Sequence, residues 1–209
     1  MEVIEAMRTR RSNKSYDPAR SVDRDTITKL VEQACLSPSS FNMQHWRLVI
    51  VDEVEHKRAL HALAFKQQQV LDAAATLIVV GDPSVYEKAE QHFGAWVNAG
   101  VFDEATLKTY VKMAFDLYDP PTSQAARDEA VRSCSLWAMS FMLVAWDQGL
   151  ATCPMIGFDA DGVQSKFHIP EPMFPVMLIT LGYQAKSPRP RMARRKVDEI
   201  VCWNEFQRS

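Results

Sequence analysis

The sequence contains few of the residues on which metal sites, disulfides and glycine-rich nucleotide loops depend. Its 209 residues include only four cysteines, five histidines and seven glycines. No CxxC, HExxH, GxGxxG, Walker-type or GxSxG pattern occurs among them. We therefore expect free cysteines, no metal site, no Rossmann or P-loop nucleotide site and no α/β-hydrolase nucleophile. If the chain binds a phosphate group, arginine and lysine side chains must hold it.

Long apolar runs and an excess of one charge are also missing. The most apolar stretch, residues 136–146, is too short to cross a bilayer and is typical of a buried helix. The net charge of -2 gives no general attraction to nucleic acid or to an anionic membrane. The first twenty residues are interrupted by charge and lack the apolar core of a signal peptide. We expect a cytoplasmic protein with neither a nucleic-acid nor a membrane partner.

What is present predicts one α+β domain over residues 1–209. Apolar residues make up 47% of the chain, which is enough for a single substantial core. Apolar residues at helical spacing predict helices at the opening residues and at about 23–36, 53–64, 84–118 and 123–148. Short apolar runs predict strands at 48–51, 76–80, 176–181 and 197–202. Because helices outnumber strands without strict alternation, we predict an α+β fold.

Two cationic clusters lie near the ends of the chain. The first contains Arg10, Arg11, Ser12 and Lys14, and the second contains Arg189 and Arg191. Cations at the end of a helix complement its dipole, which is the ordinary interpretation of the first cluster. Arginine forks also hold phosphate oxygens in pairs, and Ser12 adds a hydroxyl donor. The second cluster is part of a basic tail that continues through Arg194, Arg195 and Lys196. A basic run of this kind is usually a solvated face, with nucleic-acid contact as a minor alternative.

Two further segments carry no charged side chain but suit a ligand. The loop after the second predicted helix presents Pro38, Ser39, Ser40 and Asn42. Turn chemistry explains small polar residues there, but a polyol also needs several small donors and acceptors together. The segment 153–158 is ordinarily a tight turn. Its Gly157 would let the main chain approach a ligand and aim an N–H at it.

In order and spacing, these four segments resemble the flavin-binding elements of the nitroreductase family. The resemblance covers essentially the whole chain and is strongest in residues 10–46 and 150–191. It implies a mixed β-sheet flanked by helices, in an intertwined homodimer with one FMN at each of two sites built from both subunits. It implies hydride transfer from NADH or NADPH, through the flavin N5, to a nitroaromatic, quinone or similar acceptor. The cofactor carries out this chemistry, so we expect no catalytic side chain.

The same resemblance implies a role for each matching residue. Arg10, Ser12, Arg189 and Arg191 would contact the FMN phosphate, with Arg11 beside it. Lys14, Gln67 and Gln69 would face the pyrimidine edge of the ring. Pro38, Ser39, Ser40 and Asn42 would come from the partner subunit. The main-chain N–H groups of Ile156 and Gly157 would reach the N5 and O4 edge, and Pro154 and Met155 would pack on the ring.

Some positions leave alternatives open. Ile156 and His45 replace the residues usual in the family, and Ile156 would narrow the space above the ring. Aromatic residues at near-helical spacing are more often core than substrate box, yet the family carries a variable excursion over the flavin at 84–118. We therefore predict that Phe115 and Phe102 line the substrate space. A flavin-binding protein with another role, such as flavin fragmentation or carriage, and a cofactor-free interaction protein remain as alternatives.

Overall fold

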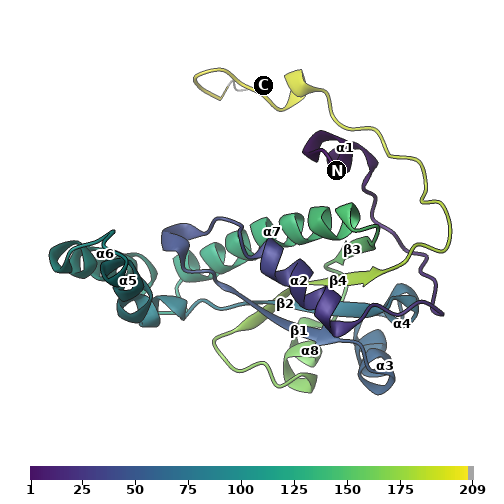
Figure 1. Ribbon diagram of the computed structural model, residues 1–209, viewed down its shortest axis with the longest axis horizontal. Coiled ribbons are helices and arrows are strands. Elements are labelled where there is room, and N and C mark those ends of the chain that lie inside the picture. The colour runs from purple at the N-terminus through teal and green to yellow at the C-terminus, as the bar shows by residue number, and fades with distance from the viewer. Residues whose placement is uncertain (207–209) are drawn as a thin grey trace.

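One four-stranded sheet lies at the centre of the chain, which a computed structural model describes over residues 1–206 (Figure 1). Its strands pair antiparallel in the order β1-β2-β4-β3. They are β1 (Trp46–Val51), β2 (Ala75–Gly81), β3 (Ala151–Met155) and β4 (Phe174–Gly182). The predicted α+β class is confirmed. The family resemblance implies a mixed sheet, whereas the only parallel pairing within residues 1–206 is an isolated bridge between Ser12 and Thr152.

Eight α-helices within residues 1–206 surround or flank this sheet. They are α1 (Val3–Thr9), α2 (Arg24–Ala34), α3 (Val54–Leu63), α4 (Gln69–Asp72), α5 (Ala89–Asn98), α6 (Glu104–Tyr118), α7 (Gln124–Asp147) and α8 (Ala160–Lys166). Short 3₁₀ turns lie at Ser40–Asn42, Val85–Lys88 and Val197–Glu199. None of the helices in this part of the chain has both the length and the apolar character that a membrane crossing requires.

Strand β2 is buried along its whole length because helices cover both faces of the sheet. Leu77 and Val79 point into one core, which also contains residues of α2 and α7. Ile78 and Val80 point into a second core on the opposite face, with residues of α3 and α8. The alternation is the two-residue period of a strand. In the sequence, residues 77–80 are an unbroken apolar run, because neither face of the strand meets water.

Helices α5 and α6 project from one end of the molecule and have a core of their own (Figure 1). Phe93, Leu107 and Ala114 are buried inside this hairpin. The chain turns between the helices at Gly100, whose φ of +72° suits glycine. Asp103 then begins α6 by accepting a hydrogen bond from the Thr106 N–H at 2.7 Å.

Helix α1 and the end of the C-terminal tail lie above α7 in the view of Figure 1, and both stand away from the sheet. Trp146 ties α1 to the end of α7, since its indole N–H donates to Thr9 Oγ1 at 2.8 Å. Apolar side chains on both segments are exposed: Val3, Ile4, Met7, Val197, Ile200 and Trp203. The prediction of a strand at 197–202 is wrong for the single chain. Residues Val197–Glu199 form a 3₁₀ turn, and within residues 1–206 they pair with none of the four strands of the sheet.

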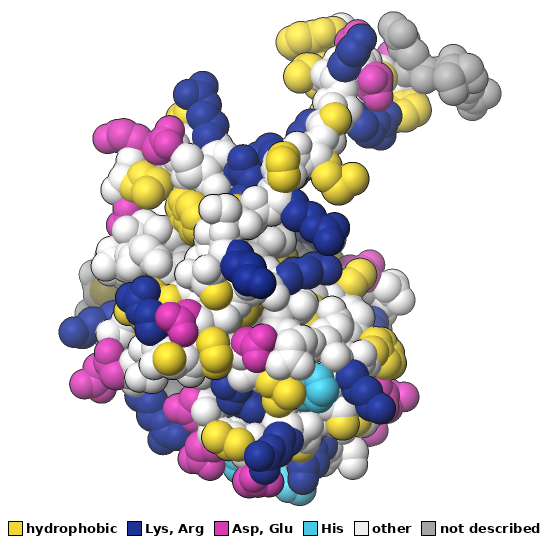
Figure 2. All heavy atoms as spheres, turned by 90° about the vertical axis from the view of Figure 1, so that its right-hand side faces the viewer, with side chains coloured by type: hydrophobic (Ala, Val, Ile, Leu, Met, Phe, Trp, Pro, Cys, Tyr) yellow, Lys and Arg dark blue, Asp and Glu magenta, His cyan; other side chains and the backbone are white. Residues whose placement is uncertain are grey.

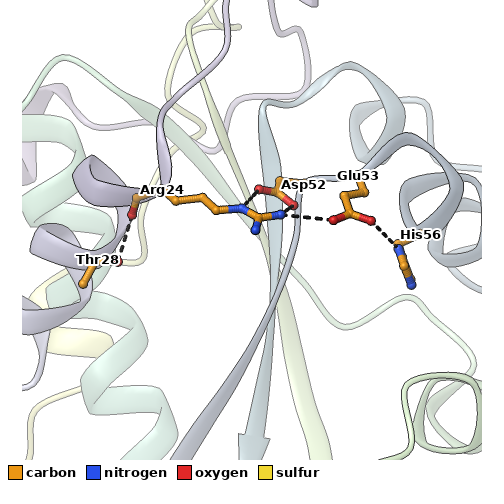
Figure 3. A network of polar contacts seen from close by, with 5 residues as sticks. All are labelled: Arg24, Thr28, Asp52, Glu53 and His56. Atoms are coloured by element: carbon orange, nitrogen blue, oxygen red, sulfur yellow. Dashed lines mark hydrogen bonds and ion pairs between the residues drawn. The ribbon is translucent and has the colours of Figure 1, made fainter.

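A surface network connects the start of α2 to the end of β1 and the start of α3 (Figure 3). Arg24 donates to both carboxylate oxygens of Asp52, at 2.7 and 2.9 Å, and to Glu53 at 3.2 Å. His56 lies 3.4 Å from the other oxygen of Glu53. The two-pronged contact with Arg24 lowers the pKa of Asp52 from its usual range.

Candidate functional site

A cationic pocket of about 540 Å³ lies between residues 10–15 and the tail residues 186–194. No acidic side chain lines it within residues 1–206. Figure 2, which faces this end of the molecule, shows Lys and Arg side chains gathered where the tail leaves the body. The pocket therefore has a strongly positive potential that suits an anion. Seven cationic residues line it: Arg10, Arg11, Lys14, Lys186, Arg189, Arg191 and Arg194.

Two of these arginines contact the end of α1. Nη1 of Arg11 and Nη2 of Arg191 each donate to three main-chain carbonyls in and just after the last turn of α1, at 2.7–3.2 Å. The carbonyls at a helix end lack partners within the helix and carry partial negative charge. Arg11 therefore has the ordinary role of a cation that complements a helix end, and the distant Arg191 has the same role.

Arg10 has a different environment. Its guanidinium is half-buried, and its Nη1 is buried with no hydrogen-bond partner in residues 1–206. Burial, followed by the nearby charges of Arg191 and Arg11, lowers the pKa of Arg10. A half-buried charge surrounded by like charges is unfavourable until a counter-charge is present. A phosphate dianion in the pocket would supply that counter-charge, so the residues present fit a phosphorylated ligand.

The cationic segment lies against β3 and hence near the Cys153–Gly157 region. Ser12 pairs with Thr152 in the parallel bridge, and the Asn13 N–H donates to the Thr152 carbonyl at 2.9 Å. Burial raises the pKa of the Cys153 thiol, while the charges of Lys14 and Arg10 oppose that rise. The thiol is thus within electrostatic reach of both cations.

Residues after α3 meet the same region from the other side. Gln67 donates through Nε2 to the Gly157 carbonyl at 2.7 Å, and Gln69 donates to Gln67 Oε1 at 3.3 Å. Gln69 also lies 3.4 Å from the Met155 sulfur. Ile156 is 83% exposed, and Gly157 beside it is exposed as well. The structure thus brings the two glutamines to the 155–157 segment, at the end of the molecule that holds the cationic pocket.

Among the predicted cofactor-binding segments, the polar loop is the one that a single chain does not bring to this end. Residues Ser40–Asn42 lie at the other end of the sheet, beside the α5–α6 hairpin (Figure 1). Ser39 Oγ accepts a hydrogen bond from the Gln44 N–H at 2.9 Å, which closes the loop on itself. Pro38 precedes the loop and is exposed. Within one chain the loop and the arginines therefore cannot contact the same small ligand.

The two predicted substrate residues lie in different environments within the hairpin. Phe115 on α6 is 38% exposed and packs edge-on against Tyr86, with ring centroids 5.1 Å apart. Phe102 is half-buried between Trp96 and Tyr110, with centroids at 4.8 and 4.6 Å. Phe102 thus has the contacts of a core residue, whereas Phe115 keeps a free face.

The comparisons with known proteins agree with this geometry. The family model described as Nitroreductase family matches residues 7–183. The chain belongs to the nitroreductase family. The matched residues include every segment of the candidate site except the pocket-lining tail residues 186–194, which lie beyond them.

Related proteins extend this nitroreductase assignment over nearly the whole chain. MhqN of Bacillus subtilis, named provisionally as an NAD(P)H nitroreductase, is 34% identical over 201 residues, which cover 96% of this chain and 98% of MhqN. A Thermus thermophilus protein named NADH dehydrogenase is 30% identical over 199 residues, covering 93% of this chain and 92% of that protein. The crystal structure of a provisionally named nitroreductase from Exiguobacterium sibiricum, in complex with FMN, matches with a TM-score of 0.89 at 29% identity and covers 97% of each chain.

In and around the candidate site lie residues that sequence reasoning did not single out. Lys186 and Arg194 line the pocket, but in the sequence they belong to a basic tail that does not distinguish them from solvated residues. Tyr118 donates from its hydroxyl to Ser40 Oγ at 2.6 Å, although 78 residues separate them. Nothing local in the sequence could indicate that contact. His45 is buried, which lowers its pKa to about 4, and its Nδ1 lies 3.3 Å from Ser133 Oγ.

Proposed function

We propose that this chain is an FMN-dependent oxidoreductase that takes hydride from NADH or NADPH and reduces a nitroaromatic, quinone or similar acceptor. The observation that carries the proposal is Arg10, which lines an acid-free cationic pocket and whose buried Nη1 has no hydrogen-bond partner in residues 1–206. The pocket adjoins a segment with an exposed main chain at Ile156 and Gly157. Family membership and the FMN complex of the related structure support the same cofactor.

In this proposal the phosphate is held by Arg10, Ser12 and Arg189, with Arg191 adding the N–H groups that α1 leaves free. Arg11 acts beside them by fixing the end of α1. Charge-assisted contacts of this type are shorter and stronger than neutral ones. They also orient the ligand, since a guanidinium presents its donors in a fixed plane.

The ring end would be held by Lys14, Gln67, Gln69 and the 154–157 segment. Bound FMN would supply the redox chemistry, accepting a hydride at N5 and passing it on to the acceptor. Lys14 would place a positive charge near the pyrimidine edge and so stabilise negative charge on the reduced ring. Pro154 and Met155 would pack against the ring, and Ile156 would limit the space above it.

The site would be completed by a second copy of the chain. Pro38, Ser39, Ser40 and Asn42 lie at the end of the molecule opposite the arginines, so an intertwined homodimer is needed to bring both to one flavin. The exposed apolar residues of α1 and the tail favour the same arrangement, because large apolar side chains without partners mark interaction surfaces. Strand β1 is an edge of the sheet, where a further strand could pair.

Purification followed by steady-state kinetics tests the proposal. The protein should be yellow, with a flavin absorption band, and should oxidise NADH or NADPH when a quinone or nitroaromatic is added. A yellow protein that turns over neither nucleotide would favour the alternative role in flavin fragmentation or carriage. A colourless protein that binds no added FMN would overturn the proposal.

The cytoplasmic location stays a prediction, for which cell fractionation is the test.

A further inference from the structure

The polar loop and the α5–α6 hairpin are joined by a short, partly buried hydrogen bond. Tyr118, the last residue of α6, is 3% exposed and donates to Ser40 Oγ at 2.6 Å. A hydroxyl contact this short fixes the side chain of Ser40 relative to α6. Any movement of the end of α6 must either carry the loop along or break this bond.

A second connection runs through Phe41, which belongs to the loop by its backbone and to the hairpin by its side chain. Its ring packs edge-on against Phe93, Tyr110 and Tyr118, with centroids at 6.3, 6.0 and 6.4 Å. These are favoured geometries for aromatic pairs. The loop therefore inserts a side chain into the core of the hairpin.

The backbone of the loop needs such support. Phe41, Asn42 and Gln44 all have positive φ, at 52°, 54° and 55°. This region is unfavourable for residues with a side chain, above all for a bulky one such as Phe41. Conformations of this kind persist where surrounding contacts hold them. The holding contacts in this case come from the hairpin and from the Ser39 hydroxyl.

We propose that Tyr118 and Phe41 couple the α5–α6 hairpin to the 39–42 loop, so that an acceptor bound beneath the hairpin slows the release of FMN. The inference rests on the proposed function, in which the loop holds the polyol of FMN and the hairpin covers the ring. Tyr118 is then a positioning residue, since it acts on the cofactor through Ser40. A ligand that orders the hairpin also orders the loop, and by linkage FMN must strengthen the binding of that ligand.

The first test removes only the hydroxyl that joins the two parts. Tyr118→Phe keeps the aromatic packing and should release FMN about 3- to 10-fold faster, the effect expected for one neutral hydrogen bond. The matched control is Tyr86→Phe, which removes a hydroxyl that donates to Asp119 Oδ1 at 2.9 Å in the same aromatic cluster. It should lose similar stability but release FMN at the wild-type rate. Flavin fluorescence after dilution measures the release rates. The melting temperatures show whether the two variants lose the same stability.

The second test measures the coupling itself. With 4-nitrobenzoate present and no NAD(P)H, no reaction occurs, and FMN release from the wild type and from Tyr86→Phe should slow. In Tyr118→Phe the slowing should be largely lost. Equal release rates in the two variants, or equal slowing in both, would overturn the inference even if the enzyme reduces every acceptor offered. Failure of the wild type to bind FMN would instead overturn the proposed function.

Discussion

The arginines of the cationic pocket have different partners, which predicts different effects of removing them. Arg10→Ala should weaken FMN binding by about 1.5–3 kcal/mol, or roughly 10- to 150-fold, because one charge-assisted phosphate contact is lost. Riboflavin, which lacks the phosphate, should bind almost as before. Fluorescence titration of the apoprotein measures both affinities.

Arg20→Ala is a suitable control for the change in net charge, since Arg20 lies outside the pocket and stacks 3.4 Å above the Tyr183 ring. It should leave both affinities unchanged. Arg191→Ala should also weaken FMN binding more than riboflavin binding. It should in addition lower the melting temperature, because Arg191 holds the end of α1. Equal losses of FMN and riboflavin in Arg10→Ala would contradict a phosphate role.

The contact between Asp52 and Arg24 predicts a pH-dependent stability. Because the folded-state pKa of Asp52 is lowered, the contact stabilises the fold above the unfolded-state pKa of about 4, and this contribution is lost as the pH falls through the folded-state pKa. Asp52→Asn should therefore melt at a slightly lower temperature near pH 7, and the gap should close below about pH 4. Thermal melts between pH 3 and 7 measure it. A gap that is independent of pH would show that the lost contact is not ionic.

Among the structural elements, those with strong periodicity could be predicted from the sequence. The helix predicted over 123–148 is α7, and the buried run at 76–80 is β2. Strand β3 was missed because it is a short edge strand interrupted by Pro154, so it has neither the length nor the alternation of a typical strand. The strand predicted at 197–202 failed for the opposite reason: the local pattern suits a strand, but Val197–Glu199 form a 3₁₀ turn outside the four-stranded sheet.

In the candidate site, too, some features could be predicted from the sequence and others could not. Residue types and their order indicated a phosphate, a polyol and a ring, because these depend on local clusters such as Arg10–Lys14. Contacts between distant segments, such as Gln67 with Gly157 and Tyr118 with Ser40, depend on the fold and leave no local signal. The same holds for the different environments of Arg10 and Arg11, which are neighbours in the sequence.

The α5–α6 hairpin predicts contrasting effects for its two phenylalanines. Phe115→Ala should change the ratio of kcat/KM for a quinone and a nitroaromatic several-fold, with FMN content and melting temperature nearly unchanged, because its exposed face would meet the acceptor. Phe102→Ala should cost about 1–3 kcal/mol of stability, less than for a fully buried ring, through lost packing. Steady-state kinetics and thermal melts separate the two. A stability loss in Phe115→Ala with unchanged acceptor preference would place it in the core.

At the scale of the whole molecule, a site shared between two chains predicts complementation. One chain carries Arg10→Ala, and the other carries Ser40→Ala with Asn42→Ala. In the mixed dimer one site has both defects and the other has none, so the dimer should bind one FMN with wild-type affinity. If each site were built within one chain, the mixed dimer would have no intact site. Co-expression with two affinity tags isolates the mixed dimer for titration.

The half-buried, unpaired charge of Arg10 also links the survival of the protein to the supply of its ligand. A ligand that binds only the folded state stabilises it by about 2.7 kcal/mol at a concentration 100 times its dissociation constant. Chains made when flavin is scarce would keep the unneutralised pocket and unfold more often, and proteases would remove them first. Inorganic phosphate should therefore raise the melting temperature of the apoprotein more than chloride at equal ionic strength, and Arg10→Ala should reduce that difference. Cofactor starvation would then lower the amount of enzyme in the cell as well as its activity.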